Sequence, residues 1–118
     1  MPLVVKRREA VYYKTTCGKE PVYDYLKRLE DPVGRAKIQI KISRAERGNF
    51  GQEGKGYRHI EGDIWELKVD CGPGYRVYFA LDRDELILLL AVGDKRSQGL
   101  DIKKAQKYWA GYKSRKWK

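Results

Sequence analysis

Five polar side chains fall on one face of a predicted β-hairpin, where carboxylates and cations would lie close together. Apolar and polar residues alternate along Ile64 to Cys71 and again along Tyr75 to Asp82, as in strands with one buried and one wetter face. The polar residues of the wetter face are Glu66, Lys68, Asp70, Arg76 and Tyr78. A carboxylate can accept a proton and cations can stabilise an anion. This face is therefore the first candidate site for chemistry.

The turn between the two runs, Gly72-Pro73-Gly74, fixes how the predicted strands pair. A loop of only Pro73-Gly74 would bring the apolar face of one strand onto the polar face of the other. A three-residue loop keeps the apolar faces together, so we expect that register. It pairs Val69 with Val77, Leu67 with Phe79, Lys68 with Tyr78 and Asp70 with Arg76. The last pair could equally be an ordinary cross-strand ion pair, worth under ~1 kcal/mol if exposed.

The charge of the chain points to a polyanionic partner. The sequence has 26 Lys and Arg against 16 Asp and Glu, a net charge of +10 on 118 residues. Nucleic acid is the first partner that this favours, and an anionic membrane surface the second. No apolar run is long enough to span a membrane, and Lys6-Arg7-Arg8 is not followed by the apolar stretch of a signal peptide. Because nucleic acid ranks first, we expect a cytoplasmic protein whose partner is nucleic acid and not a membrane.

The sequence shows no pattern of a metal or cofactor site. Cys17 and Cys71 lie far apart in no metal-binding spacing, and we expect two reduced thiols. The single histidine, His59, is expected to be a packing or surface residue rather than an acid. The Gly-Lys pair within 48–56 lacks the spacing of a phosphate-binding loop. We expect no metal and no cofactor.

The elements that must position the polar face form one domain over residues 1–118. We expect a first strand over 8–15 and a helix from near Lys19, with Pro21 in its first turn. Asp31-Pro32 predicts the start of a second helix, and Gly48 suits its end. Within this segment the run AKIQIKI (36–42) alternates like a strand, but the capping residues and the length favour a helix.

The second half of the chain continues with strands and a last helix. We expect a loop over 48–56, a short strand over 57–60 and an apolar strand over 86–92 that is covered on both faces. Ser97 is a plausible cap for a final helix, whose apolar side carries Ile102, Ala105, Trp109 and Tyr112. A basic tail follows at about 113–118. Trp65, Trp109 and Tyr112 are expected to be packing residues before they are platforms for bases.

Four segments in order carry a family resemblance. They are GDIWELKV, GPGYRVYFA, LLLAVGDKRSQ and DIKKAQKYW. Together they resemble the RelE/HigB superfamily of bacterial toxins from type II toxin–antitoxin systems, and most closely its phage-related addiction module killer proteins. The resemblance implies an α+β fold of the RelE type, with two N-terminal helices, an antiparallel sheet and a C-terminal helix. This agrees with a helix over 36–42.

The resemblance also implies an activity, which is cleavage of mRNA on the translating ribosome without a metal. The ribose 2′-hydroxyl attacks the adjacent phosphate and expels the 5′-oxygen, which requires a base, cations and an acid. By the family pattern Arg76 stabilises the phosphate, Lys68 is catalytic, and Lys95 and Arg96 assist the phosphate or the leaving group. Glu66 departs from the pattern, in which a lysine stands there. It is the best candidate base if it is not merely a solvated strand residue, and Lys68 is next.

Further residues are expected to bind RNA, and a partner protein is expected to neutralise the toxin. The RNA-binding candidates are Lys55, Arg58, Tyr78, Lys103 and Lys107. The resemblance implies an antitoxin, typically a helix-turn-helix protein encoded beside it, with mRNA and the ribosome as further partners. Two alternatives stay open. One is a toxin of the same fold that inhibits DNA gyrase instead of cleaving RNA, and the other is a non-catalytic RNA-binding module, for which the charge alone would suffice.

Overall fold

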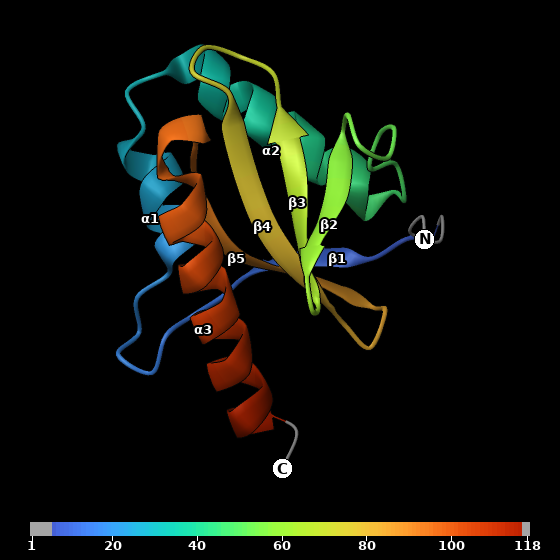
Figure 1. Cartoon of the computed structure of the whole chain (residues 1–118), viewed down its shortest axis with the longest axis vertical. Helices are drawn as coiled ribbons and strands as arrows, with labels where there is room; N and C mark the ends of the chain where they lie inside the picture. Colours follow the sequence, from blue (N-terminus) through green and yellow to red (C-terminus); the bar gives the residue numbers. More distant parts are fainter. Residues whose placement is uncertain (1–5, 117–118) are drawn as a thin grey trace.

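The computed structural model describes residues 6–116, which form one five-stranded sheet and three α-helices (Figure 1). In chain order the elements are β1 (Glu9–Tyr12), α1 (Pro21–Arg28), α2 (Pro32–Glu46), β2 (Tyr57–Glu61), β3 (Ile64–Val69), β4 (Tyr75–Asp82), β5 (Leu86–Asp94), the 3₁₀ turn η1 (Lys95–Ser97) and α3 (Gln98–Lys116). The predicted α+β fold, with two N-terminal helices and one C-terminal helix, is confirmed.

The sheet is antiparallel except at one edge. Its strand order is β1-β5-β4-β3-β2, and every neighbouring pair is antiparallel apart from β1 and β5, which run parallel. The expectation of an antiparallel sheet is therefore corrected at β1. The chain can reach this parallel position because two helices and three strands intervene between β1 and β5. The strand expected over 8–15 is shorter than predicted and spans Glu9–Tyr12.

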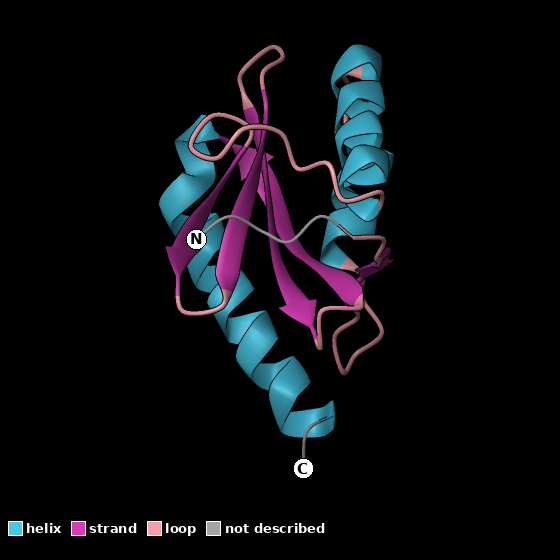
Figure 2. Ribbon diagram, turned by 90° about the vertical axis from the view of Figure 1, so that its right-hand side faces the viewer, coloured by secondary structure: helices cyan, strands magenta, loops and turns pink. Residues whose placement is uncertain are grey.

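Helices cover both faces of the sheet, which Figure 2 shows nearly edge-on with α2 on one side and α3 on the other. Side chains of α1 and α2, among them Val22 and Ile38, pack on the face that carries Val69 and Val77. Side chains of α3, among them Trp109, pack on the opposite face with Tyr78 and Leu90. In the described part of the chain, no helix combines the length and the apolar character needed to cross a membrane.

The segment that alternates like a strand is helical, as expected. Asp31 caps α2 by accepting a hydrogen bond from the backbone nitrogen of Gly34 at 2.9 Å, and Pro32 occupies the first turn. At the other end Gly48 adopts a φ of +89°, which suits glycine in a helix C-terminal turn. The capping residues therefore decide the structure of this segment against its period-2 pattern.

The register of the β3–β4 hairpin differs from the prediction by two residues. Val69 pairs with Tyr75, Lys68 with Arg76, and Glu66 with Tyr78. The loop is not the three residues 72–74 but the five residues 70–74, so Asp70 lies outside the strands and does not face Arg76. Gly72 and Gly74 both have positive φ, which lets the chain turn within this longer loop. A shift of two residues keeps each side chain on its predicted face.

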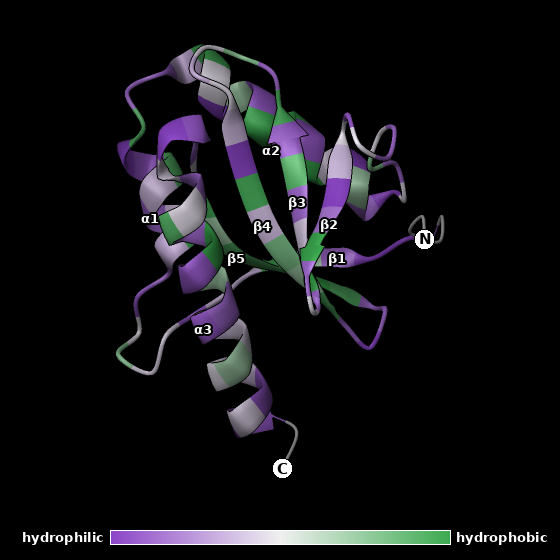
Figure 3. Ribbon diagram, in the orientation of Figure 1, coloured by the Kyte–Doolittle hydropathy of each residue, from purple (hydrophilic) through white to green (hydrophobic). Residues whose placement is uncertain are grey.

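The face expected to be wetter is largely buried. The alternating hydrophilic and hydrophobic bands on β3 and β4 are visible in Figure 3, yet Glu66 and Tyr78 have no exposed surface. Arg76 keeps only 11% of its side chain exposed. The reason is that the start of α3 and side chains from β2 lie over this part of the sheet. Lys68 remains half-buried.

Candidate functional site

The centre of the candidate site is the buried carboxylate of Glu66 on β3. Arg58 of β2 donates from Nε to Oε1 at 2.8 Å, and Gln98 donates from Nε2 to Oε2 at 3.0 Å. The Nε of Arg76 lies 3.9 Å from the same Oε2. An ionised carboxylate without water needs such donors and countercharges, so Glu66 is stabilised as a structural anion. Both of its oxygens are engaged, which leaves it badly placed to accept a proton from a substrate.

Arg76 is the cation that this carboxylate holds in place. It lies on β4 between Lys68 of β3 and Gly93 of β5. Among residues 6–116 its Nε has no hydrogen-bond partner, although this atom is buried. A buried donor without a partner is costly, and it is stabilised by the nearby Glu66 carboxylate. The guanidinium is thus held beside Glu66, with 11% of the side chain exposed.

The remaining predicted catalytic residues gather less tightly. Lys68 lies on the same sheet face as Arg76, and its Nζ donates to the carbonyl oxygen of Gly54 at 2.9 Å. Lys95 extends over the hairpin loop, where its Cε would lie 3.0 Å from a Cβ placed on Gly74. Arg96 is 85% exposed, and its Nη2 donates to Oδ2 of Asp94 at 2.9 Å. The structure therefore brings Glu66, Lys68 and Arg76 together and leaves Arg96 at the periphery.

Gly93, the β5 residue paired with Arg76, allows the start of α3 to lie directly against the sheet. A Cβ on Gly93 would lie 2.0 Å from Oδ2 of Asp101 and 2.4 Å from Oγ of Ser97. No larger side chain fits there without moving the first turn of α3. This close approach brings Gln98 within reach of Glu66. Ser97, expected as a helix cap, donates its hydroxyl to Oδ2 of Asp101 at 2.5 Å.

Two carboxylates at this end of α3 respond in opposite ways to their surroundings. Burial raises the pKa of Asp101 above its usual range, against the lowering effect of the Ser97 hydrogen bond. The hydrogen bond from Arg96 lowers the pKa of Asp94, which also accepts from the backbone nitrogen of Arg96 at 2.8 Å and so caps η1. Asp94 therefore stays charged and holds Arg96 at the start of the turn.

Tyr78 is a core residue rather than a surface one. It has no exposed area and packs beneath α3 with Ile64 and Ala80. Burial raises the pKa of its hydroxyl above the usual range, and the charge of Glu66 raises it further. RNA has no access to this ring in the structure, so Tyr78 is excluded from the proposed RNA surface below.

The other residues expected to bind RNA are accessible and come from three elements. Lys55 is exposed in the loop before β2, and Lys103 and Lys107 are exposed on α3. Arg58 keeps 44% of its side chain exposed while it binds Glu66.

Gln98 is the member of the site that the sequence did not single out. Its only signal was its place directly after the basic turn.

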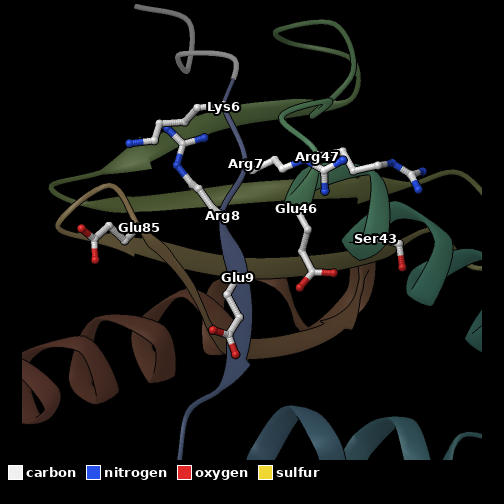
Figure 4. A pocket seen from close by; sticks show the side chains of 8 residues that line it. All are labelled: Lys6, Arg7, Arg8, Glu9, Ser43, Glu46, Arg47 and Glu85. Atoms are coloured by element: carbon white, nitrogen blue, oxygen red, sulfur yellow. The ribbon is translucent and has the colours of Figure 1, made fainter.

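A separate hollow of about 680 Å³ lies at the β1 edge, and Figure 4 shows its side chains. Its lining mixes both charges: Lys6, Arg7, Arg8, Glu9, Ser43, Glu46, Arg47 and Glu85. Glu46 accepts a hydrogen bond from the backbone nitrogen of Ala10 at 2.9 Å, and Arg8 forms an ion pair with Asp84. These contacts cover a free sheet edge, which is a structural role. Over residues 6–116 no group of three or more His, Cys, Asp or Glu side chains could hold a metal ion.

Comparison with known proteins places this arrangement in a family. The family described as Phage derived protein Gp49-like (DUF891) matches residues 24–109. This range includes α2, the four strands β2 to β5 and most of α3. An uncharacterized protein of Haemophilus influenzae is 39% identical over 82 residues, covering 70% of this chain and 79% of that protein. All residues of the Glu66, Arg76 and Gln98 cluster lie inside the matched family segment. The chain belongs to the Gp49-like family of phage-derived proteins.

Proposed function

We propose that this protein is the toxin of a type II toxin–antitoxin pair and cleaves mRNA on the translating ribosome. The observation that carries the proposal is the Arg76 guanidinium, whose Nε lies 3.9 Å from the buried Glu66 carboxylate while 11% of the side chain stays exposed. The net charge of +10 and the resemblance of the surrounding motifs to RelE/HigB toxins support it.

The chemistry asks for cations around a phosphate whose negative charge grows in the transition state. The 2′-oxygen forms a bond to phosphorus while the bond to the 5′-oxygen breaks, leaving a 2′,3′-cyclic phosphate and a 5′-hydroxyl. Arg76 would bind the phosphate oxygens, with Lys68 beside it on the next strand. Lys95, and Arg96 beyond it, would assist the phosphate or the leaving 5′-oxygen. Lys55, Arg58, Lys103 and Lys107 would bind flanking RNA phosphates.

Glu66 would serve this reaction as a positioning residue. With both oxygens engaged and no exposed surface, it holds Arg58 and Arg76 in place and does not reach a ribose. The proton of the 2′-hydroxyl would then go to another group, and Lys68 is the next candidate in this face. As a base it would accept that proton as the neutral amine.

The burial of Glu66 also favours a second candidate function. A toxin of the same fold that binds its target without cleaving RNA, such as an inhibitor of DNA gyrase, needs no accessible base. The two candidates differ in what happens to cellular mRNA.

Induced expression in a bacterium, with mapping of the 5′ ends of its mRNAs, tests the proposal. Growth arrest with new 5′-hydroxyl ends inside translated regions is expected, together with rescue by co-expression of the small neighbouring gene. Arrest without new ends would replace cleavage with the second candidate. Normal growth with no binding by the neighbour would remove the toxin function.

A further inference from the structure

The segment AKIQIKI leaves one isoleucine facing solvent. The helical period turns Ile38 and Ile42 into the core, where they are 0% and 7% exposed. Ile40 points outward and is 49% exposed. Val33, seven residues earlier and thus on the same side of α2, is 60% exposed. Neither residue contributes to the core or to the site around Arg76.

Ile40 lines a hollow of about 360 Å³ between α2 and the end of β3, which we name the α2 groove. Its lining residues are Lys37, Ile40, Lys41, Arg44, Val69 and Asp70. The three cations follow one another at spacings of four and three residues, so they form one stripe along the helix. Against them the lining holds a single carboxylate, Asp70. The lining of the α2 groove thus combines one exposed isoleucine and the buried Val69 with a stripe of three cations.

The α2 groove and Arg76 belong to opposite faces of the sheet. Val69 packs in the cluster beneath α1 and α2, whereas residues that alternate with it, such as Lys68, share the face of Arg76 and α3. A molecule bound in the α2 groove would leave Arg76 uncovered. The groove is therefore a second surface, and its role does not depend on whether Arg76 cleaves RNA.

We propose that the α2 groove docks an acidic segment of another protein, with apolar side chains that contact Ile40. Carboxylates match the cationic stripe, and an amphipathic helix with apolar residues at i, i+3, i+4 and i+7 fits a groove of this character. A second copy of this chain would bring a net charge of +10 against cations. RNA would use the cations but finds no aromatic side chain in the lining on which bases could stack.

The test uses a fluorescent peptide of about 20 residues, with Leu at i, i+3, i+4 and i+7 and Glu at most other positions, long enough to form a helix. Its binding to the full chain is measured by anisotropy. Ile40→Ser and Lys41→Glu should each weaken binding at least about tenfold. The matched controls are Leu100→Ser, which changes another exposed apolar residue, and Lys27→Glu, at an exposed position of α1. Lys27→Glu changes the net charge by the same amount as Lys41→Glu. Both should bind as the wild type does.

Two further probes distinguish the possible occupants of the α2 groove. The same peptide with Ser in place of Leu should bind at least about tenfold more weakly. A single-stranded RNA of about 20 nucleotides should bind Ile40→Ser and wild type equally. The proposal is overturned if the Leu peptide does not bind, or if Lys27→Glu weakens it as much as Lys41→Glu. RNA binding that falls in Ile40→Ser would assign the groove to RNA. Self-association that disappears in Ile40→Ser would assign it to a second copy.

Discussion

Gln98 donates from Nε2 to Oε2 of Glu66 at 3.0 Å, which ties the first residue of α3 to the middle of β3. Arg58 and Arg76 approach the same carboxylate from β2 and β4. One buried side chain therefore joins three strands and a helix. The Arg76 side chain is held against this junction as well as by its place in β4.

Glu66→Gln should destabilise the fold, because it removes the negative charge that compensates two arginines. Removing one partner of a buried ion pair leaves the other charge uncompensated, so we expect a loss of about 3 kcal/mol in the free energy of unfolding. Urea denaturation measures it. Glu30→Gln, an exposed carboxylate, is the control and should stay within about 0.5 kcal/mol of the wild type. A loss no larger than that of the control would show that Glu66 is not a structural anion.

Gly93→Ala should displace the first turn of α3, since its Cβ would overlap Asp101 and Ser97. We expect destabilisation of about 1–3 kcal/mol, as for other overpacked sites. Gly99→Ala is the matched control on α3, where a Cβ meets nothing within 4 Å. Because alanine has a higher helix propensity than glycine, the free energy of unfolding of that variant should rise by up to about 1 kcal/mol, measured by thermal or urea denaturation. Equal effects at both positions would contradict the close approach at Gly93.

The hairpin shows what alternation can and cannot predict. The period-2 alternation correctly placed Glu66, Lys68 and Arg76 on one face, because a shift of two residues leaves every side chain on the same face. For the same reason the alternation could not distinguish a three-residue loop from the five-residue loop that forms. The backbone nitrogen of Gly74 bonds the carbonyl oxygen of Cys71 at 2.9 Å, a local contact that no pattern of faces reports.

The burial of the polar face could not be read from the hairpin alone. A polar residue in an alternating strand indicates solvent only if no other element covers it. Here the cover comes from Gln98 of α3 and from Arg58 of the neighbouring strand β2. The start of α2 was predictable, because Asp31 and Pro32 act locally. The parallel pairing of β1 with β5 was not, since it joins segments more than seventy residues apart.

Asp31 should make stability depend on pH in the acid range. The hydrogen bond from the Tyr75 hydroxyl, and then that from the Gly34 nitrogen, lower the pKa of this carboxyl below its ordinary 3.8. An acid with a lowered folded pKa contributes stability above its unfolded pKa and loses it as the pH falls through the folded value. The stability difference between wild type and Asp31→Asn should therefore shrink below pH 3.8.

Urea midpoints at a series of pH values measure this dependence on Asp31. Tyr75→Phe is the control, because it removes the main donor and should flatten the curve. A difference that stays constant from neutral pH to about pH 2 would contradict the assigned shift.

RNA binding should weaken steeply with salt if the cations of α3 contact phosphates. Each contact with a single strand contributes about −0.7 to the slope of log affinity against log salt concentration. Lys103→Ala and Lys107→Ala should each make the slope less negative by about that amount, measured by anisotropy with a labelled RNA. Lys27→Ala on α1 should leave it unchanged. A slope near zero for the wild type would remove the electrostatic basis of the RNA surface.

Arg76→Ala should abolish mRNA cleavage and toxicity while the chain still folds. Its guanidinium presents a planar set of donors to a phosphate as charge builds, and loss of such donors costs about 10²–10³ in rate. Arg76→Lys should restore activity only in part, because a point charge cannot make two parallel hydrogen bonds. Cleavage is measured by 5′-end mapping, and folding by circular dichroism.

Arg28→Ala, an exposed arginine on α1, is the control for Arg76 and should cleave normally. Glu66→Gln separates the two roles proposed for that carboxylate. If Glu66 is the general base, the variant should lose cleavage at every temperature at which the chain folds. If Glu66 is a positioning residue, the variant should retain part of the rate. Lys68→Ala then tests the remaining candidate for the base. If Arg76→Ala folds and cleaves at the full rate, the site does not lie at this junction.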